Sequence, residues 1–154
     1  MAAASNKQFV TFVMGEELYG IDIYNTQEII RIPEITPIPN ALEYVEGIIN
    51  LRGDIIPIIN LERKFRMVSS IQEKKEVIII RTHTAKLGII VNKVFRVIQA
   101  EDKNISLPPS ILSGIEEEYI KGVTHIEDER LVILLDIEKM FFEEEIKTLQ
   151  EIGG

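Results

Sequence analysis

The sequence predicts a mainly β protein in which two small β-barrels pack together, with short helices and a helix at the C-terminus. The 154-residue chain is 45% hydrophobic but only 6% aromatic, so most of its apolar residues are Ile, Val and Leu, which favour strands. These residues gather in short runs bounded by turn residues. The same series of runs also occurs twice, over residues 9–66 and again over residues 76–141, which indicates an internal repeat.

The first half begins with two predicted strands, at residues 9–14 and 18–23. Apolar residues then recur at helical spacing, which predicts a short turn of helix within residues 23–30. Three of the seven residues in the segment 33–39 are prolines. Because proline cannot donate to a β-ladder, this segment is predicted to be an edge or an extended connector.

Two strongly apolar strands follow, at residues 45–51 and 55–59, joined by Arg52-Gly-Asp54. Neither strand alternates between polar and apolar residues, so we expect both faces of each to be covered. Asn60 is the predicted N-cap of a short helix over residues 61–65.

The second half repeats this plan, with a hairpin, a third strand that continues the hairpin's sheet, and two last strands. These strands are predicted at residues 77–81, 87–91, 94–98, 119–126 and 131–135. Asp136 is the predicted cap of a C-terminal helix over residues 137–152. The candidates for the inner face of this helix are Ile137, Met140, Phe141, Leu149 and Ile152.

The two copies match in order. Tyr44-Val-Glu-Gly47 corresponds to Tyr119-Ile-Lys-Gly122, and residues 55–62 correspond to residues 131–138. Each copy is short for an independent fold, because a lone core below about 70 residues is marginal. Two packed barrels solve this problem, and antiparallel closure also removes exposed edges.

Composition excludes several classes of function. The net charge of −8 argues against nucleic-acid binding, which depends on cations that neutralise phosphates, and against a polybasic lipid contact. The absence of cysteine excludes disulfides and thiolate chemistry. No secretory signal is recognisable, and no apolar run approaches the roughly 20 residues of a membrane-spanning helix. We therefore expect a soluble, cytoplasmic protein without direct membrane insertion.

The sequence shows no catalytic constellation, and we expect no enzyme, cofactor or metal. His83 lies beside a predicted turn, where an exposed polar residue is expected, and His125 takes the place of Asn50 in the repeat. No metalloprotease, nucleophile-elbow or phosphate-loop motif is present. The acidic runs 116–118 and 143–145 lack the alternation of a calcium loop and predict solvated faces.

Arg52 lies at the tip of a hairpin between two strands that are nearly free of charge. It is either an ordinary polar turn residue or the partner of an acid elsewhere, for which Glu28 is a candidate. Such a pair would orient an interaction surface more than it would stabilise the fold.

Several segments resemble the CheW family, the coupling proteins of bacterial chemotaxis. They are Tyr19-Gly-Ile-Asp-Ile, Gln27-Glu-Ile-Ile, Ile35-Thr-Pro-Ile-Pro-Asn, Gly47-Ile-Ile-Asn-Leu-Arg-Gly-Asp-Ile-Ile-Pro, Leu87-Gly-Ile-Ile-Val, Tyr119-Ile-Lys-Gly-Val and Arg130-Leu-Val-Ile-Leu-Leu-Asp-Ile-Glu-Lys. The resemblance runs from about Phe9 to Phe141, and the Asn-Leu-Arg-Gly stretch is its most specific part.

The resemblance implies a single domain over residues 1–154: two five-stranded, SH3-like β-barrels around a shared hydrophobic seam, without catalysis. It implies a scaffold that couples the cytoplasmic tip of methyl-accepting chemotaxis receptors to the regulatory domain of the histidine kinase CheA. Receptor tips are helical hairpins, and an apolar groove flanked by charges can take a helix face. The receptor-facing positions carried over from the family are Thr26, Glu28, Gly47, Arg52, Val77 and Val97.

Two positions depart from the family pattern. Thr26 stands where Val is common, which implies a weaker or more polar contact, and Asn92 stands where Asp is frequent. The resemblance assigns no kinase-facing residue.

Three alternatives compete with a stand-alone adaptor. A CheW-like unit can be fused to a receiver, as in CheV proteins, or can form the tail of the kinase, but the chain ends soon after the second repeat. A small-ligand-binding β-barrel would need a cavity with a few converging polar groups, whereas the inward positions look filled by Ile and Val. A hydrolase would need a nucleophile and a base, and the sequence indicates neither.

Overall fold

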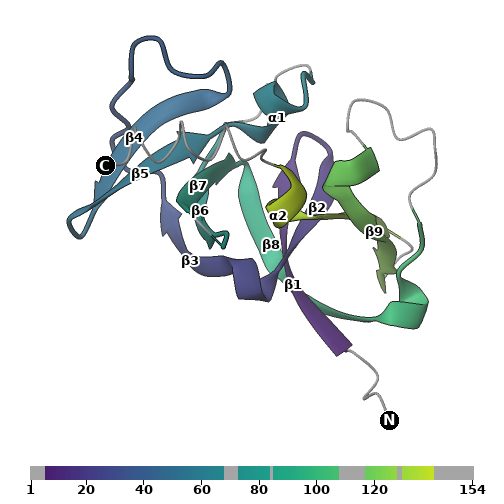
Figure 1. Cartoon of the computed structure of the whole chain (residues 1–154). Coiled ribbons are helices and arrows are strands. Elements are labelled where there is room, and N and C mark those ends of the chain that lie inside the picture. The colour runs from purple at the N-terminus through teal and green to yellow at the C-terminus, as the bar shows by residue number, and fades with distance from the viewer. Residues whose placement is uncertain (1–5, 68–72, 84, 108–116, 128–129, 141–154) are drawn as a thin grey trace.

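The computed structural model describes residues 6–67, 73–83, 85–107, 117–127 and 130–140. Over these residues the chain forms strands with short helical turns between them (Figure 1). The strands are β1 (Asn6–Met14), β2 (Glu17–Asp22), β3 (Thr26–Arg31), β4 (Val45–Leu51), β5 (Asp54–Ile59), β6 (Glu76–Arg81), β7 (Lys86–Val91), β8 (Lys93–Glu101), β9 (Ile120–Ile126) and β10 (Arg130–Leu135). The helical elements are η1 (Ile23–Asn25), α1 (Leu61–Lys64), η2 (Asp102–Asn104), η3 (Glu117–Tyr119) and α2 (Ile137–Met140).

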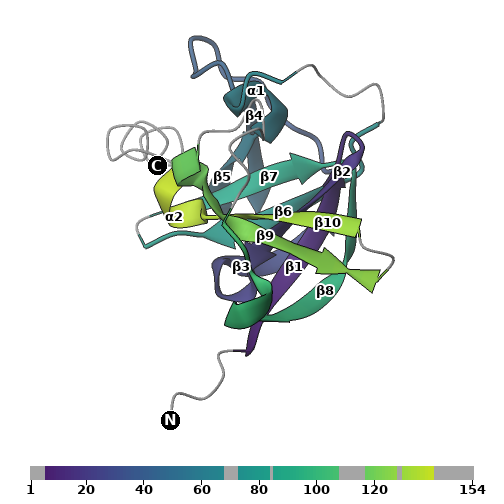
Figure 2. The same cartoon turned by 90° about the vertical axis from the view of Figure 1, so that its right-hand side faces the viewer.

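The strands form two five-stranded sheets, which confirms the predicted fold class. Sheet A has the order β8-β1-β2-β10-β9, and sheet B has the order β3-β6-β7-β5-β4. Figures 1 and 2 show the two sheets side by side. Neighbouring strands are antiparallel except for the pairs β2–β10 and β5–β7, which are parallel.

Each sheet takes strands from both halves of the chain. If the strands are numbered within each half, both sheets have the order 3-1-2-5-4, with strands 1 and 2 from one half and the other three from the other half. The prediction that residues 94–98 continue the sheet of the second hairpin is therefore wrong, because β8 pairs with β1. Only Asn92 separates β7 from β8, and an antiparallel neighbour in the same sheet needs a turn of at least about two residues. The chain instead runs straight on into the other sheet.

Over the described residues, the two edges of each sheet are not joined by a ladder, and a single isolated bridge links them. In sheet B, Thr36 follows the edge strand β3 and bridges to Ile48 of the opposite edge strand β4. In sheet A, Ser106 follows β8 and bridges to Val123 of β9. The segment after β3 is thus an extended connector, as its prolines predicted.

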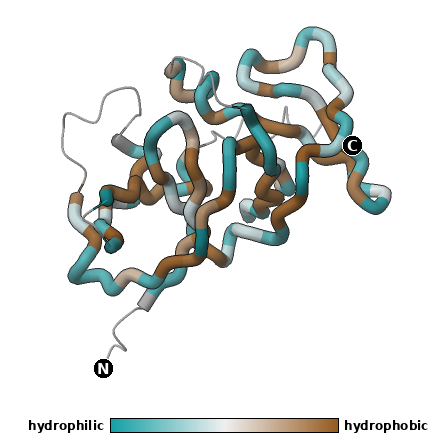
Figure 3. The backbone as a smooth tube through the Cα atoms, turned by 180° about the vertical axis from the view of Figure 1, so that it is seen from behind, coloured by the Kyte–Doolittle hydropathy of each residue, from teal (hydrophilic) through white to brown (hydrophobic). Residues whose placement is uncertain are grey.

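The apolar side chains form three clusters, and the largest is the shared seam that the resemblance implied. The seam contains residues of both sheets, such as Phe12 and Tyr19 of sheet A and Ile78 and Ile89 of sheet B. The other two clusters lie within sheet A and within sheet B. Figure 3 shows hydrophobic stretches of the chain alternating with hydrophilic ones.

The helix caps agree with the prediction. The Asn60 side chain accepts a hydrogen bond from the Arg63 N–H at 3.2 Å, and the Asp136 carboxylate accepts one from the Lys139 N–H at 3.3 Å. Ile137 and Met140 are buried, as expected for the inner face of α2. Phe141, Leu149 and Ile152, and the predicted helix beyond residue 140, lie outside the described residues.

Two expectations in the first half are right only in part. A short helical turn does form, η1 at Ile23–Asn25, but residues 26–31 form the strand β3. The apolar residues of this segment have a spacing that fits a helix and also fits a strand that is half-buried on one face. The pairing with β6 favours the strand. Strand β4 lies at the edge of sheet B and alternates in burial, so only β5 has the expected run of buried residues, Ile56–Ile59.

Tyr19 gives the fold a dependence on alkaline pH. Its side chain is 1% exposed, and burial, with smaller contributions from Glu17 and Glu62, raises the pKa of Tyr19 to about 12. An unfolded tyrosine ionises near pH 10, so the unfolded chain releases the proton first. The free energy of unfolding is therefore unaffected below about pH 10 and falls as the pH rises towards 12, by about 1.4 kcal/mol at pH 11.

We expect Tyr19→Phe to remove this part of the alkaline destabilisation. Urea unfolding between pH 8 and pH 11.5 measures it, with Tyr24→Phe as the control because Tyr24 is 93% exposed. Equal alkaline slopes for the two variants would contradict the assignment.

Candidate functional site

The predicted ion pair between Arg52 and Glu28 forms in the structure. Arg52 and Gly53 are the central residues of the β4–β5 hairpin, and both have positive φ, 49° and 90°. Positive φ at both central positions is what the type I′ two-residue hairpin turn requires. The Asn50 side chain stabilises the turn by accepting a hydrogen bond from the Gly53 N–H at 3.0 Å.

The ion pair spans the opening between the two edge strands of sheet B. Glu28 belongs to β3 and Arg52 to the hairpin that follows β4. The two side chains are 66% (Arg52) and 29% (Glu28) exposed, and exposed pairs contribute at most about 1 kcal/mol to stability. The pair therefore orients charged groups at the surface more than it holds the barrel together.

The structure brings together only part of the carried-over set. Thr26 and Glu28 lie on β3, and both are half-buried. Val97 is 47% exposed but lies on β8 of sheet A. Gly47 and Val77 are buried in sheet B, where Val77 packs among the isoleucines of that sheet's own cluster.

Two exposed apolar residues beside these positions were missed by the sequence reasoning. Ile29 of β3 is 41% exposed and follows Glu28, and Phe95 of β8 is 41% exposed on the same strand as Val97. Exposure of Ile29 could have been predicted if residues 26–31 had been interpreted as a strand, because successive side chains of a strand point to opposite faces.

Sheet A carries a second ion pair at the place equivalent to Arg52–Glu28. In sheet B, Glu28 lies opposite Ile79, and Ile79 pairs with Gly88. In sheet A the glycine that matches Gly88 is Gly20, which pairs with Thr11. The Thr11 hydroxyl donates a hydrogen bond to the Arg96 carbonyl and accepts one from the Arg96 N–H. Arg96 therefore lies beside Thr11 as Glu28 lies beside Ile79, and the two residues occupy equivalent places.

The second pair has the opposite polarity. The Arg96 guanidinium lies 3.9 Å from the Glu127 carboxylate in the β9–β10 connection, so the strand supplies the cation and the connection supplies the anion. Phe95 adds an aromatic face, with the guanidinium carbons of Arg96 and Arg130 at 5.3 and 5.7 Å from its ring centroid. The two sheets thus carry ion pairs at equivalent places, with the positions of the cation and the anion exchanged.

The described residues include no metal-binding cluster, and both histidines lie at the surface. No group of three or more His, Asp or Glu in this part of the chain could hold a metal ion. His83 has a side chain that is 88% exposed, as predicted, and His125 is also exposed. None of the helices in the described ranges has the length and hydrophobicity to span a bilayer.

Comparisons with known proteins support the resemblance to CheW-like proteins. A family model described as the CheW-like domain matches residues 8–145. The chain belongs to the CheW-like family. The chemotaxis protein CheW of Treponema pallidum (strain Nichols) is 41% identical over 157 residues, which cover 97% of this chain and 92% of that protein. The chemotaxis protein CheW of Klebsiella aerogenes is 35% identical and covers 96% of this chain and 89% of its own length.

A solved CheW-like structure has the same fold. The crystal structure of the scaffolding protein TtCheW from Thermoanaerobacter tengcongensis is similar with a TM-score of 0.80 and 33% identity, covering 92% of this chain and 91% of that chain. The resemblance inferred from the sequence is therefore confirmed. The chain is a CheW-like member of a family of chemotaxis scaffolds.

Proposed function

We propose that this chain is a non-catalytic adaptor of bacterial chemotaxis, which couples the cytoplasmic tips of methyl-accepting receptors to the regulatory domain of the histidine kinase CheA. The observation that carries the proposal is the match of residues 8–145 to the CheW-like domain. The cytoplasm is the proposed compartment, because receptor tips and the kinase are reached there. No cofactor is needed for a role that consists of binding two partners.

For the receptor we propose Thr26, Glu28 and Arg52 of sheet B and, as a separate contact on sheet A, Val97. Exposed Ile29 of β3 is a further candidate contact added from the structure. Arg52 and Glu28 supply a fixed pair of charges, while Ile29 and Val97 supply exposed apolar contacts. A helix face with an apolar stripe and flanking polar groups suits such a surface.

Gly47 and Val77 have an indirect part in this proposal. Both are buried, so they shape the strands of sheet B rather than touch the partner. Their substitution should change partner binding only as far as it changes the sheet.

We further propose that residues 1–154 act as one domain with repeats at residues 9–66 and 76–141. The strand exchange between the sheets supports this, because neither half contains a complete sheet. The small-ligand alternative has less support, since the interiors of both sheets contain clusters of packed side chains.

Arg52→Ala tests the receptor surface. We expect the free energy of unfolding to change by less than about 1 kcal/mol, because the pair is exposed, while the affinity for a receptor signalling fragment falls. The charge-swapped double variant Glu28→Arg/Arg52→Glu rebuilds the pair with reversed polarity, and it separates loss of the pair from loss of its direction. A large loss of folding, with normal receptor binding by the folded fraction, would show that Arg52 is structural.

Calorimetric titration with receptor signalling-domain fragments and with the CheA regulatory domain tests the whole proposal. Saturable binding of both partners is the expected result. If neither partner bound at micromolar concentrations, the adaptor proposal would fail.

A further inference from the structure

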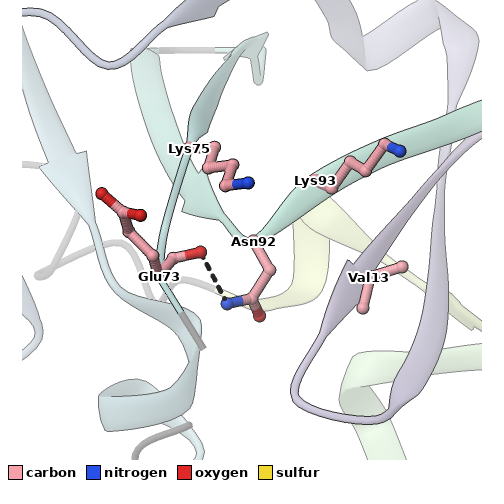
Figure 4. A pocket seen from close by; sticks show the side chains of 5 residues that line it. All are labelled: Val13, Glu73, Lys75, Asn92 and Lys93. Atoms are coloured by element: carbon pink, nitrogen blue, oxygen red, sulfur yellow. Dashed lines mark hydrogen bonds between the residues drawn. The ribbon is translucent and has the colours of Figure 1, made fainter. Parts of the chain in front are cut away.

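Two adjoining pockets lie where the sheets meet, and they share two lysines. The first has a volume of about 460 Å³ and is lined by Val13, Glu73, Lys75, Asn92 and Lys93 (Figure 4). The second has a volume of about 400 Å³ and is lined by Arg31, Lys75, Glu76 and Lys93. We call the two together the basic cleft, after Arg31, Lys75 and Lys93.

The cations of the basic cleft come from three separate places in the fold. Arg31 ends β3, Lys75 precedes β6, and Lys93 begins β8 of the other sheet. All three are exposed, and none forms an ion pair with another residue of the described ranges. Gathering unpaired like charges is unfavourable in itself. In a chain with a net charge of −8, such a gathering indicates a local role.

The floor of the cleft is held in place by Asn92, which is 4% exposed. Its side-chain oxygen accepts a hydrogen bond from the Gly15 N–H at 2.9 Å, and its amide nitrogen donates to the Glu73 carbonyl at 3.2 Å. The Lys75 N–H also donates to the Val91 carbonyl at 3.0 Å. The backbone that carries the two lysines is therefore positioned before any ligand arrives, which lowers the entropic cost of binding.

The two glutamates of the cleft leave its cations available. One carboxylate oxygen of Glu76 accepts a hydrogen bond from the Val94 N–H at 2.8 Å. Figure 4 shows the Glu73 carboxylate pointing away from the ammonium groups of Lys75 and Lys93. Neither glutamate forms an ion pair with the three cations in the described part of the chain.

We propose that the basic cleft binds a small polyphosphate-type anion, that is, a molecule with two or more adjacent phosphoryl groups. Lys75 and Lys93 line both pockets and Arg31 lines only the second, so a molecule that extends over both pockets lies among three cations. Lysine ammonium and arginine guanidinium groups are the usual protein partners of phosphate oxygens. The cleft is lined by residues of sheet A and of sheet B. A molecule that binds the folded chain there, and not the unfolded chain, therefore stabilises the arrangement of the two sheets. None of the residues of the basic cleft belongs to the proposed receptor surface.

Titration of the ¹⁵N-labelled chain with inorganic tripolyphosphate tests the proposal. We expect saturable shifts of the backbone amides of Arg31, Lys75, Asn92 and Lys93, together with a rise in Tm. Sodium chloride at matched ionic strength is the control for general screening. Shifts that sodium chloride reproduces, or that spread over the surface without saturation, would overturn the proposal. So would tighter binding of a Glu-rich peptide to the same residues, because that result would identify an acidic protein partner instead.

Matched double variants sharpen the test. Lys75→Gln/Lys93→Gln should weaken tripolyphosphate binding by at least about tenfold. Arg81→Gln/Lys139→Gln removes the same charge at residues outside the cleft: Arg81 ends β6 at the end opposite Glu76, and Lys139 lies in α2. This control should bind almost as tightly as the unaltered chain, and equal weakening by both variants would refute a specific site.

Discussion

Gly47→Ala is expected to destabilise the fold by about 4 kcal/mol, because the structure has no space for a Cβ at this position. A Cβ built there would lie 2.3 Å from the Thr36 carbonyl oxygen, and Gly47 has φ of +152°. The collision is with backbone, so a rotamer change cannot relieve it. The Thr36–Ile48 bridge that closes sheet B, with two hydrogen bonds of 2.9 Å, should be lost first.

Gly53→Ala is the matched control, since Gly53 also has positive φ, +90°, but nothing lies within 4 Å of its Cβ position. It therefore reports backbone strain without a collision, and we expect a cost of about 1 to 2 kcal/mol. Urea unfolding compares the two, and hydrogen exchange at the amides of Thr36 and Ile48 locates the damage. Equal destabilisation by the two substitutions would show that the close contact is unimportant.

Lys74→Ala is expected to cost about 3 kcal/mol of stability, although it removes only one side chain near the surface. Lys74 Nζ lies 2.5 Å from the carboxylate of Glu62, whose side chain is 2% exposed. Removal of the lysine takes away a cation in direct contact with this buried carboxylate, and the lost interaction is the source of the penalty. A second substitution, Glu62→Gln, should recover part of it by removing the buried charge.

Lys103→Ala is the control for this effect. Lys103 pairs with Glu101 at 3.1 Å, but the side chains are 77% and 40% exposed, so we expect a change below about 1 kcal/mol. Chemical unfolding at neutral pH measures all three variants. If Lys74→Ala and Lys103→Ala proved equally mild, burial of Glu62 would not matter to stability.

Much of the fold was predictable because the chain states its pattern twice. The matched residues Gly20 and Gly88 both lie where a Cβ would collide, with Leu134 at 2.9 Å and with Ile58 at 2.6 Å. These leucine and isoleucine contacts belong to the parallel pairs β2–β10 and β5–β7. Matching positions in the two copies therefore meet the same local requirement, and a sequence comparison detects that.

The exchange of strands was not predictable in the same way. Strands rich in isoleucine can pair with one another in many registers, so their sequences do not identify the partner. A prediction from the order of the strands therefore pairs neighbours along the chain. The predicted strands at residues 87–91 and 94–98 left two residues between them, enough for a hairpin turn. The one-residue link at Asn92 appears only when the end of β7 and the start of β8 are fixed to a residue.

The candidate site was predictable where charge stood out from its surroundings. Arg52 is a cation between apolar strands, and its pairing with Glu28 followed from that contrast. Glu127 gave no such signal as the partner of Arg96, because it begins the charged run Glu127-Asp-Glu-Arg130. Their relation depends on the register of β8 against β1, which only the three-dimensional structure supplies.

The exchanged strands also set an order for folding during synthesis. All strands of sheet B have been made once Val91 has left the ribosome, whereas sheet A needs β10, which ends at Leu135. Strands β1 and β2 are made first and must wait for partners that are synthesised last. Phe9 and Leu18 meanwhile lack the side chains of β10 that pack with them in the folded cluster. Long-range pairing of this kind is slow, and exposed strand edges are open to aggregation. The nascent chain should therefore be most vulnerable between completion of β7 and emergence of β10, and shielding by a chaperone would have its greatest effect in that interval.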